Sequence, residues 1–168
     1  MEGSESMCIT STRTPGLYYD GYFIDWQALC AQGFVIVEDD SIVHVDRNLR
    51  GELVPPETIN GIESHAFDSC KQLSFIKIPG NVRFIGEFAF YNCCGLTTVN
   101  IPDNVKNIGE HAFDGCVQLE SVVISENVSN VGNFAFCNCL SLRSVEIRGN
   151  PSMKKHLVFA GCLIIKQA

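Results

Sequence analysis

Cysteine is the residue type in this sequence best suited to chemistry, because a thiolate binds metal ions and takes part in redox reactions. The chain has nine cysteines in 168 residues, and five of them recur every 23 residues. These five are Cys70, Cys93, Cys116, Cys139 and Cys162. We expect them to form a structural column of small buried side chains, because cysteine packs as a compact hydrophobe. The odd total leaves at least one thiol without an intramolecular partner, which favours a reducing compartment.

Metal binding or redox sensing by thiols is the alternative to a structural column. Cys93 and Cys94 are adjacent, and Cys137 and Cys139 are two residues apart, so neither pair has the Cys-x-x-Cys spacing of zinc or thioredoxin-like sites. Cys94 and Cys137 fall outside the 23-residue phase, which makes them candidates for reactive thiols. A purely structural column predicts no metal site and no cofactor.

Histidine and acidic residues do not assemble into a catalytic motif. His65 and His111 occupy the repeat position that holds Phe88 and Phe134 in the alternate copies, and this exchange predicts a packing or surface-covering role. The sequence contains no Ser/His/Asp set, Gly-rich phosphate loop or His-Glu-x-x-His motif, and its acids are dispersed. We therefore expect a protein that is not an enzyme.

Charge and hydropathy exclude two classes of partner. The sequence has 12 Lys and Arg against 19 Asp and Glu, and the net charge of −7 repels phosphate backbones, so we expect no nucleic acid partner. The longest apolar run, residues 157–165, is far shorter than the roughly 20 residues that span a bilayer, so we expect no membrane insertion. The acidic start of the chain lacks the basic and apolar parts of a secretory signal, which predicts a cytoplasmic protein.

A 23-residue repeat organises most of the chain. Ala-Phe-x-x-Cys occurs four times in this register, and a degraded fifth copy at Phe159 keeps the step. Between the copies runs a second pattern, such as Leu-x-x-Val-x-Ile-x-x-Asn from Leu96 to Asn104. Its β-branched alternation predicts a short strand with one buried face, and residues 87–93 and their equivalents predict about one turn of α-helix or 3₁₀-helix behind it. Such units stack into a solenoid, because no single unit can bury its own apolar face.

The stretch from Ile78 to Cys93, which reads Ile-Pro-Gly-Asn-Val-Arg-Phe-Ile-Gly-Glu-Phe-Ala-Phe-Tyr-Asn-Cys, resembles the BspA-like, Treponema-type leucine-rich repeat. The resemblance covers residues 53–162. It implies an α/β repeat fold: a right-handed leucine-rich-repeat solenoid with 23-residue coils, short parallel strands on the concave face and short helical turns behind. Members of this family are often surface or secreted proteins that act in adhesion. The resemblance therefore implies a cell-surface or secreted location as the alternative to the cytoplasm.

The repeat divides the chain into four segments. They are a loose N-terminal tail (1–14), an N-terminal cap (15–54), the 23-residue repeats (55–162) and a C-terminal tail (163–168). Within the cap, the apolar spacing of residues 21–32 predicts a helix, and residues 34–37 and 42–45 predict a hairpin. Pro55 stands where the first strand should have its last Ile, so this strand is predicted only weakly by the pattern.

Residues between the apolar strand positions point away from the core and align in rows when coils stack. We predict that the concave face they form binds a protein or peptide, with Phe75 and Lys77 as its anchors. The predicted binding residues are Phe75, Lys77, Thr98, Asn100, Ser121, Val123, Ser144, Glu146 and Arg148. Besides the thiol function, one more alternative is that the chain caps a longer repeat array and self-associates through its terminal coil.

Overall fold

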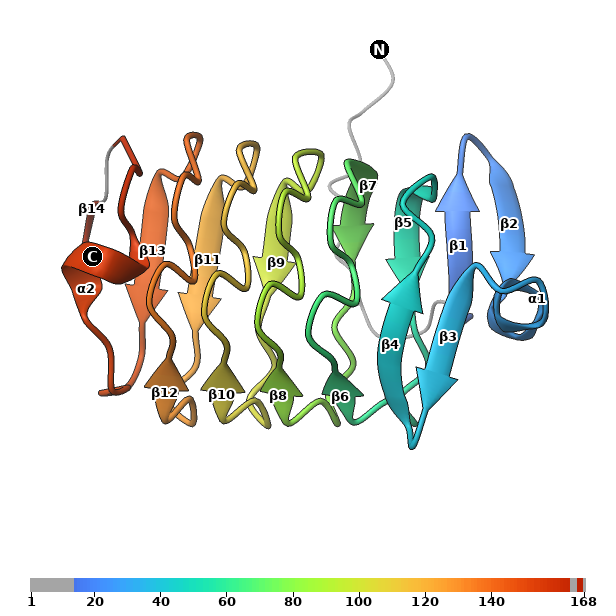
Figure 1. The fold of residues 1–168 in the computed structure, drawn as a ribbon, viewed down its shortest axis with the longest axis horizontal. Coiled ribbons are helices and arrows are strands. Elements are labelled where there is room, and N and C mark those ends of the chain that lie inside the picture. Colours follow the sequence, from blue (N-terminus) through green and yellow to red (C-terminus); the bar gives the residue numbers. More distant parts are fainter. Residues whose placement is uncertain (1–13, 164–165, 168) are drawn as a thin grey trace, which may run out of the picture.

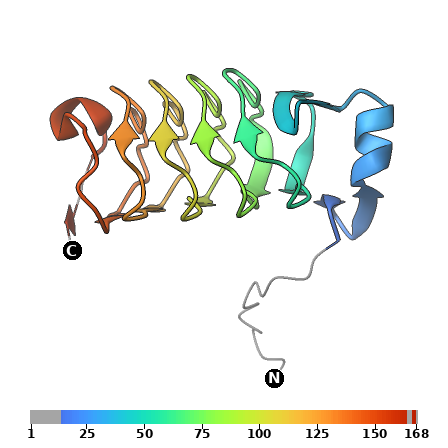
Figure 2. The same cartoon turned by 90° about the horizontal axis from the view of Figure 1, so that it is seen from below.

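The computed structural model describes residues 14–163 and 166–167, so the predicted N-terminal tail lies outside the described residues except for Thr14. The coils stack side by side along one axis, with the cap at one end and the last coil at the other (Figure 1). Seen from below, each coil is a flattened loop that lies against the next (Figure 2). Within the described residues, the helices are too short to span a lipid bilayer.

Two sheets run along the stack, where the sequence predicted one. In the larger, sheet A, the coil strands are parallel: β5 (Arg50–Val54), β7 (Gln72–Ile76), β9 (Thr98–Asn100), β11 (Ser121–Ile124), β13 (Ser144–Ile147) and β14 (Lys166–Gln167). The parallel strands of the smaller sheet B are β4 (Ser41–Val45), β6 (Gly61–Ile62), β8 (Phe84–Ile85), β10 (Asn107–Ile108) and β12 (Asn130–Val131). The predicted solenoid of 23-residue coils is confirmed.

The Ala-Phe-x-x-Cys segments form consecutive turns rather than the single helical turn that the sequence predicts. Their N–H groups alternate between the next coil and their own: Phe90 N donates to Ala112 O at 2.7 Å, and Cys93 N donates to Phe90 O at 3.2 Å. This alternation requires a left-handed backbone at two positions per coil, and φ is +55° at both Phe88 and Asn92. A helix would use its N–H groups within one coil, whereas these turns add a third row of bonds between coils.

The core consists of columns, each made by one repeat position. Five phenylalanine rings stack with centroid separations of 4.6, 4.9, 5.1 and 5.6 Å along the series Phe67, Phe90, Phe113, Phe136 and Phe159. In the four Ala-Phe-x-x-Cys copies, the Ala, Cys and Leu positions are buried beside them. Each coil thus covers the apolar side chains of its neighbours, and the stability of a coil depends on stacking.

The N-terminal cap contains two hairpins and a short helix. β1 (Gly16–Tyr19) and β2 (Tyr22–Asp25) extend sheet A with antiparallel strands, and β3 (Val35–Glu38) pairs with β4 at the predicted hairpin. The helix α1 (Trp26–Ala31) is shorter than the predicted one, because the Asp25 side chain accepts a hydrogen bond from Ala28 N and caps the helix there. The aromatic residues before Asp25 belong to a strand instead.

The first and last coils depart from the repeat in different ways. Despite Pro55, β5 pairs in parallel with β7, with a bulge after Gly51. In the last coil, Val131 N donates to Ser152 O at 3.0 Å, so the chain follows the coil path as far as Ser152. The helix α2 (Lys155–Val158) then occupies the position at which the other coils begin their turns.

One glycine position lets neighbouring coils approach closely. A Cβ on Gly109 would lie 2.5 Å from Glu87 N and 2.6 Å from the carbonyl carbon of Gly86, which is closer than side chains tolerate. Gly86 and Gly132 face the backbones of their preceding coils in the same way. The repeated glycine is therefore a consequence of the stacking distance.

We predict that Gly109→Ala lowers the free energy of unfolding by about 2 kcal/mol, because its Cβ would force two coils apart. Gly80→Ala is the matched control, since its Cβ would meet only Glu57 Oε2, at 3.4 Å. Urea unfolding followed by circular dichroism measures both variants. Equal stability of the two variants would contradict the close packing of the coils.

Candidate binding surface

The outer face of sheet A carries the predicted binding residues in two rows. The first row, paired residue by residue between neighbouring strands, is Phe75, Thr98, Ser121 and Ser144. The second row is Asn100, Val123 and Glu146, with Lys77 directly after β7 and Arg148 directly after β13. The stacking of coils therefore brings these residues onto one face.

A groove of about 420 Å³ lies on this face over β7, β9 and β11. It is lined by six of the predicted residues and by parts of the strands that carry them: Phe75, Ile76, Lys77, Ile78, Thr98, Val99, Asn100, Ser121 and Val123. Phe75 and Val123 are partly exposed and offer apolar surface there. Ser144, Glu146 and Arg148 do not line the groove.

The charged residues at the rim of the groove are paired with one another. Lys77 Nζ donates to Glu57 Oε1 at 2.8 Å, and Gly80 N donates to Glu57 Oε2 at 2.7 Å. The hydrogen bond from Lys77 lowers the pKa of the Glu57 carboxyl. Farther along, Arg148 Nε donates to Glu146 Oε1 at 2.8 Å. Lys77 is thus engaged within the chain, and the centre of the groove is uncharged.

The five repeat-phase cysteines form a column in which thiols donate hydrogen bonds. Four of them donate to the phenylalanine carbonyl of the preceding coil: Cys93 Sγ to Phe67 O at 3.1 Å, Cys116 Sγ to Phe90 O at 3.2 Å, Cys139 Sγ to Phe113 O at 3.3 Å and Cys162 Sγ to Phe136 O at 3.1 Å. The first, Cys70, makes longer contacts with Val45 O and Asp46 O. The column therefore joins successive coils, as a structural role requires.

Burial keeps the inner thiols of the column protonated, whereas the half-buried last one, Cys162, has its pKa lowered by its contact with Cys139. Burial raises the pKa of Cys70 to about 12, and it raises the pKa values of Cys93 and Cys116 well above the ordinary value. Because the thiolate is the reactive form and the metal ligand, these thiols are poor candidates for either chemistry. Among the residues that the structure describes, no group of three or more His, Cys, Asp or Glu side chains could hold a metal ion.

A buried carboxylate that the sequence analysis did not single out joins two coils. Asp114 Oδ2 lies 2.8 Å from His111 Nδ1, and Asp114 Oδ1 accepts a hydrogen bond from Asn138 Nδ2 at 3.0 Å. Burial and the neighbouring Asp114 raise the pKa of the Cys137 thiol, which makes Cys137 less reactive. The sequence feature that could have predicted this proximity is the 23-residue step, which places Asp114 and Cys137 at the same position of adjacent coils.

The two repeat histidines pack as predicted. The rings of His65, Phe88, His111 and Phe134 form an alternating stack with centroid separations of 5.0, 4.7 and 5.0 Å. The His111 ring, held between two phenyl faces and bonded to Asp114, contributes to coil contacts.

Parallel strands, single-residue columns and 23-residue coils define a leucine-rich-repeat solenoid. The family model described as the BspA type leucine rich repeat region matches residues 48–166 in six copies, one more than the four Ala-Phe-x-x-Cys copies and the degraded fifth copy in the sequence. The chain therefore belongs to the BspA-type leucine-rich repeat family. No match was found among curated proteins.

Several solved structures share this fold. A leucine-rich repeat protein of T. pallidum is 26% identical with a TM-score of 0.60, and the match covers 69% of this chain and 61% of that one. A leucine-rich repeat protein from Bacteroides ovatus is 32% identical with a TM-score of 0.59, covering 67% of this chain and 32% of that one. A leucine rich cell surface protein from Faecalibacterium prausnitzii, 24% identical over 69% of this chain and 38% of that one, has a TM-score of 0.55 and shows the fold alone. The chain spans less than two thirds of the length of each.

We predict that alkaline pH destabilises the fold through the cysteine column. An unfolded thiol ionises near pH 8.5, whereas buried Cys116 keeps its proton, so above that pH the unfolded state binds fewer protons than the native state. Each such thiol then lowers the free energy of unfolding by about 1.4 kcal/mol per pH unit. Urea titrations at pH 7 to 10 should therefore show a shallower alkaline loss in Cys116→Ala than in the wild type.

The same variant tests the hydrogen-bonded column at pH 7. We expect Cys116→Ala to lower the free energy of unfolding by about 1–2 kcal/mol, since it removes a buried thiol donor and leaves a small cavity. The control is Cys94→Ala, at a half-buried position outside the column. We expect it to lower the free energy of unfolding by less than about 0.5 kcal/mol. Equal alkaline slopes for wild type and Cys116→Ala would refute the column of protonated thiols.

Proposed function

We propose that this chain is a non-enzymatic module that binds a protein or peptide on the outer face of sheet A. The observation that carries the proposal is the groove of about 420 Å³, in which the partly exposed ring of Phe75 adjoins uncharged polar side chains. Leucine-rich repeat proteins generally bind protein ligands, which supports the proposal. A partly exposed aromatic ring beside hydrogen-bonding groups is typical of interface anchors.

The groove favours a partner segment with uncharged side chains. Thr98, Asn100 and Ser121 offer hydroxyl and amide groups for hydrogen bonds, and Phe75 and Val123 offer apolar surface. Lys77, the charged residue that lines the groove, is already paired with Glu57, so an anionic partner would have to compete with this ion pair. We therefore expect an extended peptide with an apolar side chain that contacts Phe75.

Thiol chemistry and a capping role are the other candidate functions. The column thiols Cys93 and Cys139 donate to carbonyl groups, which disfavours redox or metal chemistry at Cys93, Cys94, Cys137 and Cys139 as a set. Capping of a longer array predicts self-association through the last coil, which light scattering on the purified chain would detect. We favour peptide binding over both, because a groove supports it, whereas no group of His, Cys, Asp or Glu among the described residues could hold a metal ion.

For the location we propose a reducing compartment such as the cytoplasm. All eight cysteines among the described residues are unpaired, and the column thiols need their protons to donate to carbonyl groups. A cell-surface or secreted location with a role in adhesion, often found in the family, is the alternative. Alkylation and intact-mass analysis of protein from its native source, without reductant, distinguishes them: fully alkylated cysteines support the proposal. Disulfides, or a glycan on Asn127 in the glycosylation sequon Asn127-Val-Ser129, would overturn it.

We predict that Phe75→Ala weakens the binding of peptides selected on the wild-type chain from a displayed library of random linear peptides. Loss of a ring that a partner contacts should reduce affinity about tenfold or more. Phe84→Ala is the matched control, because Phe84 is also partly exposed but lies on sheet B, with its ring over Gly61. Isothermal calorimetry with one selected peptide measures both variants.

A second variant separates binding from folding. Ser121→Arg places a long charged side chain on the exposed first row and should block the groove without disturbing the core. Thermal unfolding followed by circular dichroism confirms that each variant is folded. Peptides that bind Phe75→Ala and Ser121→Arg as tightly as the wild type would remove sheet A as the binding face.

A further inference from the structure

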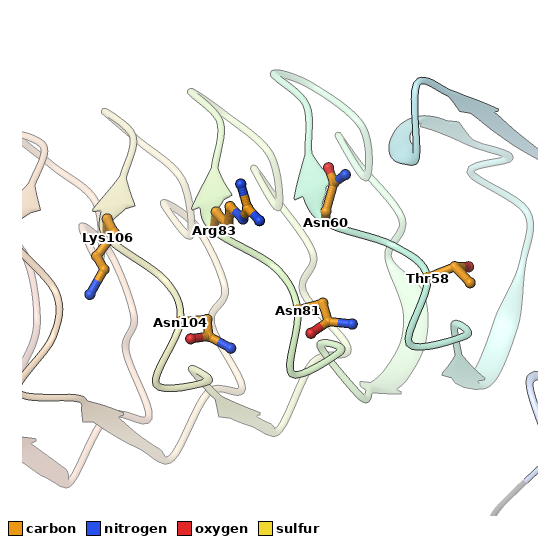
Figure 3. Close-up of a pocket in the computed structure, with 6 residues that line it drawn as sticks. All are labelled: Thr58, Asn60, Asn81, Arg83, Asn104 and Lys106. Atoms are coloured by element: carbon orange, nitrogen blue, oxygen red, sulfur yellow. The ribbon is translucent and has the colours of Figure 1, made fainter.

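A second groove, of about 460 Å³, lies at the corner where each coil passes from sheet A to sheet B. Two residues from each of three successive coils line it: Thr58, Asn60, Asn81, Arg83, Asn104 and Lys106. Figure 3 shows them in two rows, with Asn60, Arg83 and Lys106 in one row and Thr58, Asn81 and Asn104 in the other. All six side chains are polar, in contrast to the groove on sheet A.

Hydrogen bonds between coils hold both rows in place. In one row, Arg83 N donates to Asn60 O and Lys106 N donates to Arg83 O, both at 2.8 Å. In the other row, Asn81 Nδ2 donates to Glu57 O at 2.6 Å and Asn104 Nδ2 donates to Gly80 O at 2.7 Å. The spacing of the groove is thus set by the spacing of the coils, about 4.8 Å.

The side-chain amides of Asn81 and Asn104 donate hydrogen bonds within the chain, and their oxygens are available as acceptors. One N–H of Nδ2 in Asn81 and in Asn104 donates to the preceding coil, which orients each amide and leaves its Oδ1 as an acceptor for a ligand. Neither Oδ1 has a hydrogen-bond donor among the residues that the structure describes. Two neighbouring acceptors of this kind suit the hydroxyl groups of a ligand.

The two cations in the groove have no ion-pair partner within the described part of the chain. Lys77, Arg148 and Arg47 each pair with a carboxylate, whereas Arg83 and Lys106 are exposed and unpaired. In Figure 3 the Arg83 guanidinium extends toward the coil of Asn60, and Lys106 extends toward the asparagine row. Two unpaired cations on adjacent coils of a chain with net charge −7 form a local site for anionic groups.

We propose that this corner groove binds an acidic oligosaccharide, whose hydroxyl groups donate to Asn81 and Asn104 and whose carboxylate or sulfate groups pair with Arg83 and Lys106. A carbohydrate fits this groove better than an apolar side chain of a peptide, because no aromatic or aliphatic side chain lines the groove for a peptide to pack against. The proposal does not depend on peptide binding to sheet A, since the two grooves share no lining residue.

The test measures binding of short oligogalacturonate, sulfated dextran fragments, neutral dextran and inorganic sulfate to the full chain by calorimetry at low salt. We expect binding of oligogalacturonate or sulfated dextran fragments, with weaker binding as salt rises. Comparing oligogalacturonate with sulfated dextran shows whether carboxylate or sulfate is the preferred anionic group. Neutral dextran that binds equally well, inorganic sulfate that binds as tightly as the oligosaccharides, or no binding of any probe would overturn the proposal.

Paired variants locate the site. Removing both charges with Arg83→Gln and Lys106→Gln should weaken binding of the acidic oligosaccharide by about tenfold or more, whereas Arg83→Lys with Lys106→Arg should retain most of it. The matched control, Lys71→Gln with Arg143→Gln, removes the same charge from exposed positions outside the groove. Equal losses in the Gln pair and in the control would mean that only net charge matters and would refute the site. Circular dichroism melts show whether each variant is folded.

Discussion

The hydrogen bonds between one coil and the next are the constraint on which the rest of this structure depends. They form in sheet A, in sheet B and along the turns, so every coil must present its backbone at the same places as its neighbours. Glycine recurs where two backbones meet, as at Gly109, and cysteine recurs where a small thiol can reach the carbonyl of the preceding coil, as Cys116 does. The repeat in the sequence is the chemical consequence of this stacking.

Both proposed binding grooves are lined by side chains at positions that stacking leaves unspecified. On sheet A the outward strand positions vary from Phe75 to Thr98 to Ser121, and at the corner the row changes from Asn60 to Arg83 to Lys106. Both sets are held at fixed spacing by backbone bonds that do not involve their side chains. A rigid scaffold with variable rows separates stability from recognition, and the two grooves differ in chemistry because their rows differ.

The 23-residue phase in the sequence was enough to predict the solenoid, the buried columns and the rows on sheet A, because each depends on periodicity alone. The prediction of a helical turn was wrong, since Ala, Phe and Cys have the same spacing in a helical turn and in these consecutive turns. The residue type of Phe88 also does not predict its φ of +55°. Residues whose contacts cross coils in irregular segments were also missed. Glu57, which pairs with Lys77, lies in a corner loop, and Asp114 meets Asn138 only after the coils have stacked.

Residue-resolved amide hydrogen exchange by NMR tests most directly whether bonds between coils, rather than helical turns, build the back of the solenoid. We expect the amides of Phe67, Phe90 and Phe113, which donate to the next coil, to exchange as slowly as those of β9 and β11. The amide of Asn104, at an exposed corner, provides the fast reference. Exchange of the three phenylalanine amides at the rate of Asn104 would contradict the stacking on which both grooves depend.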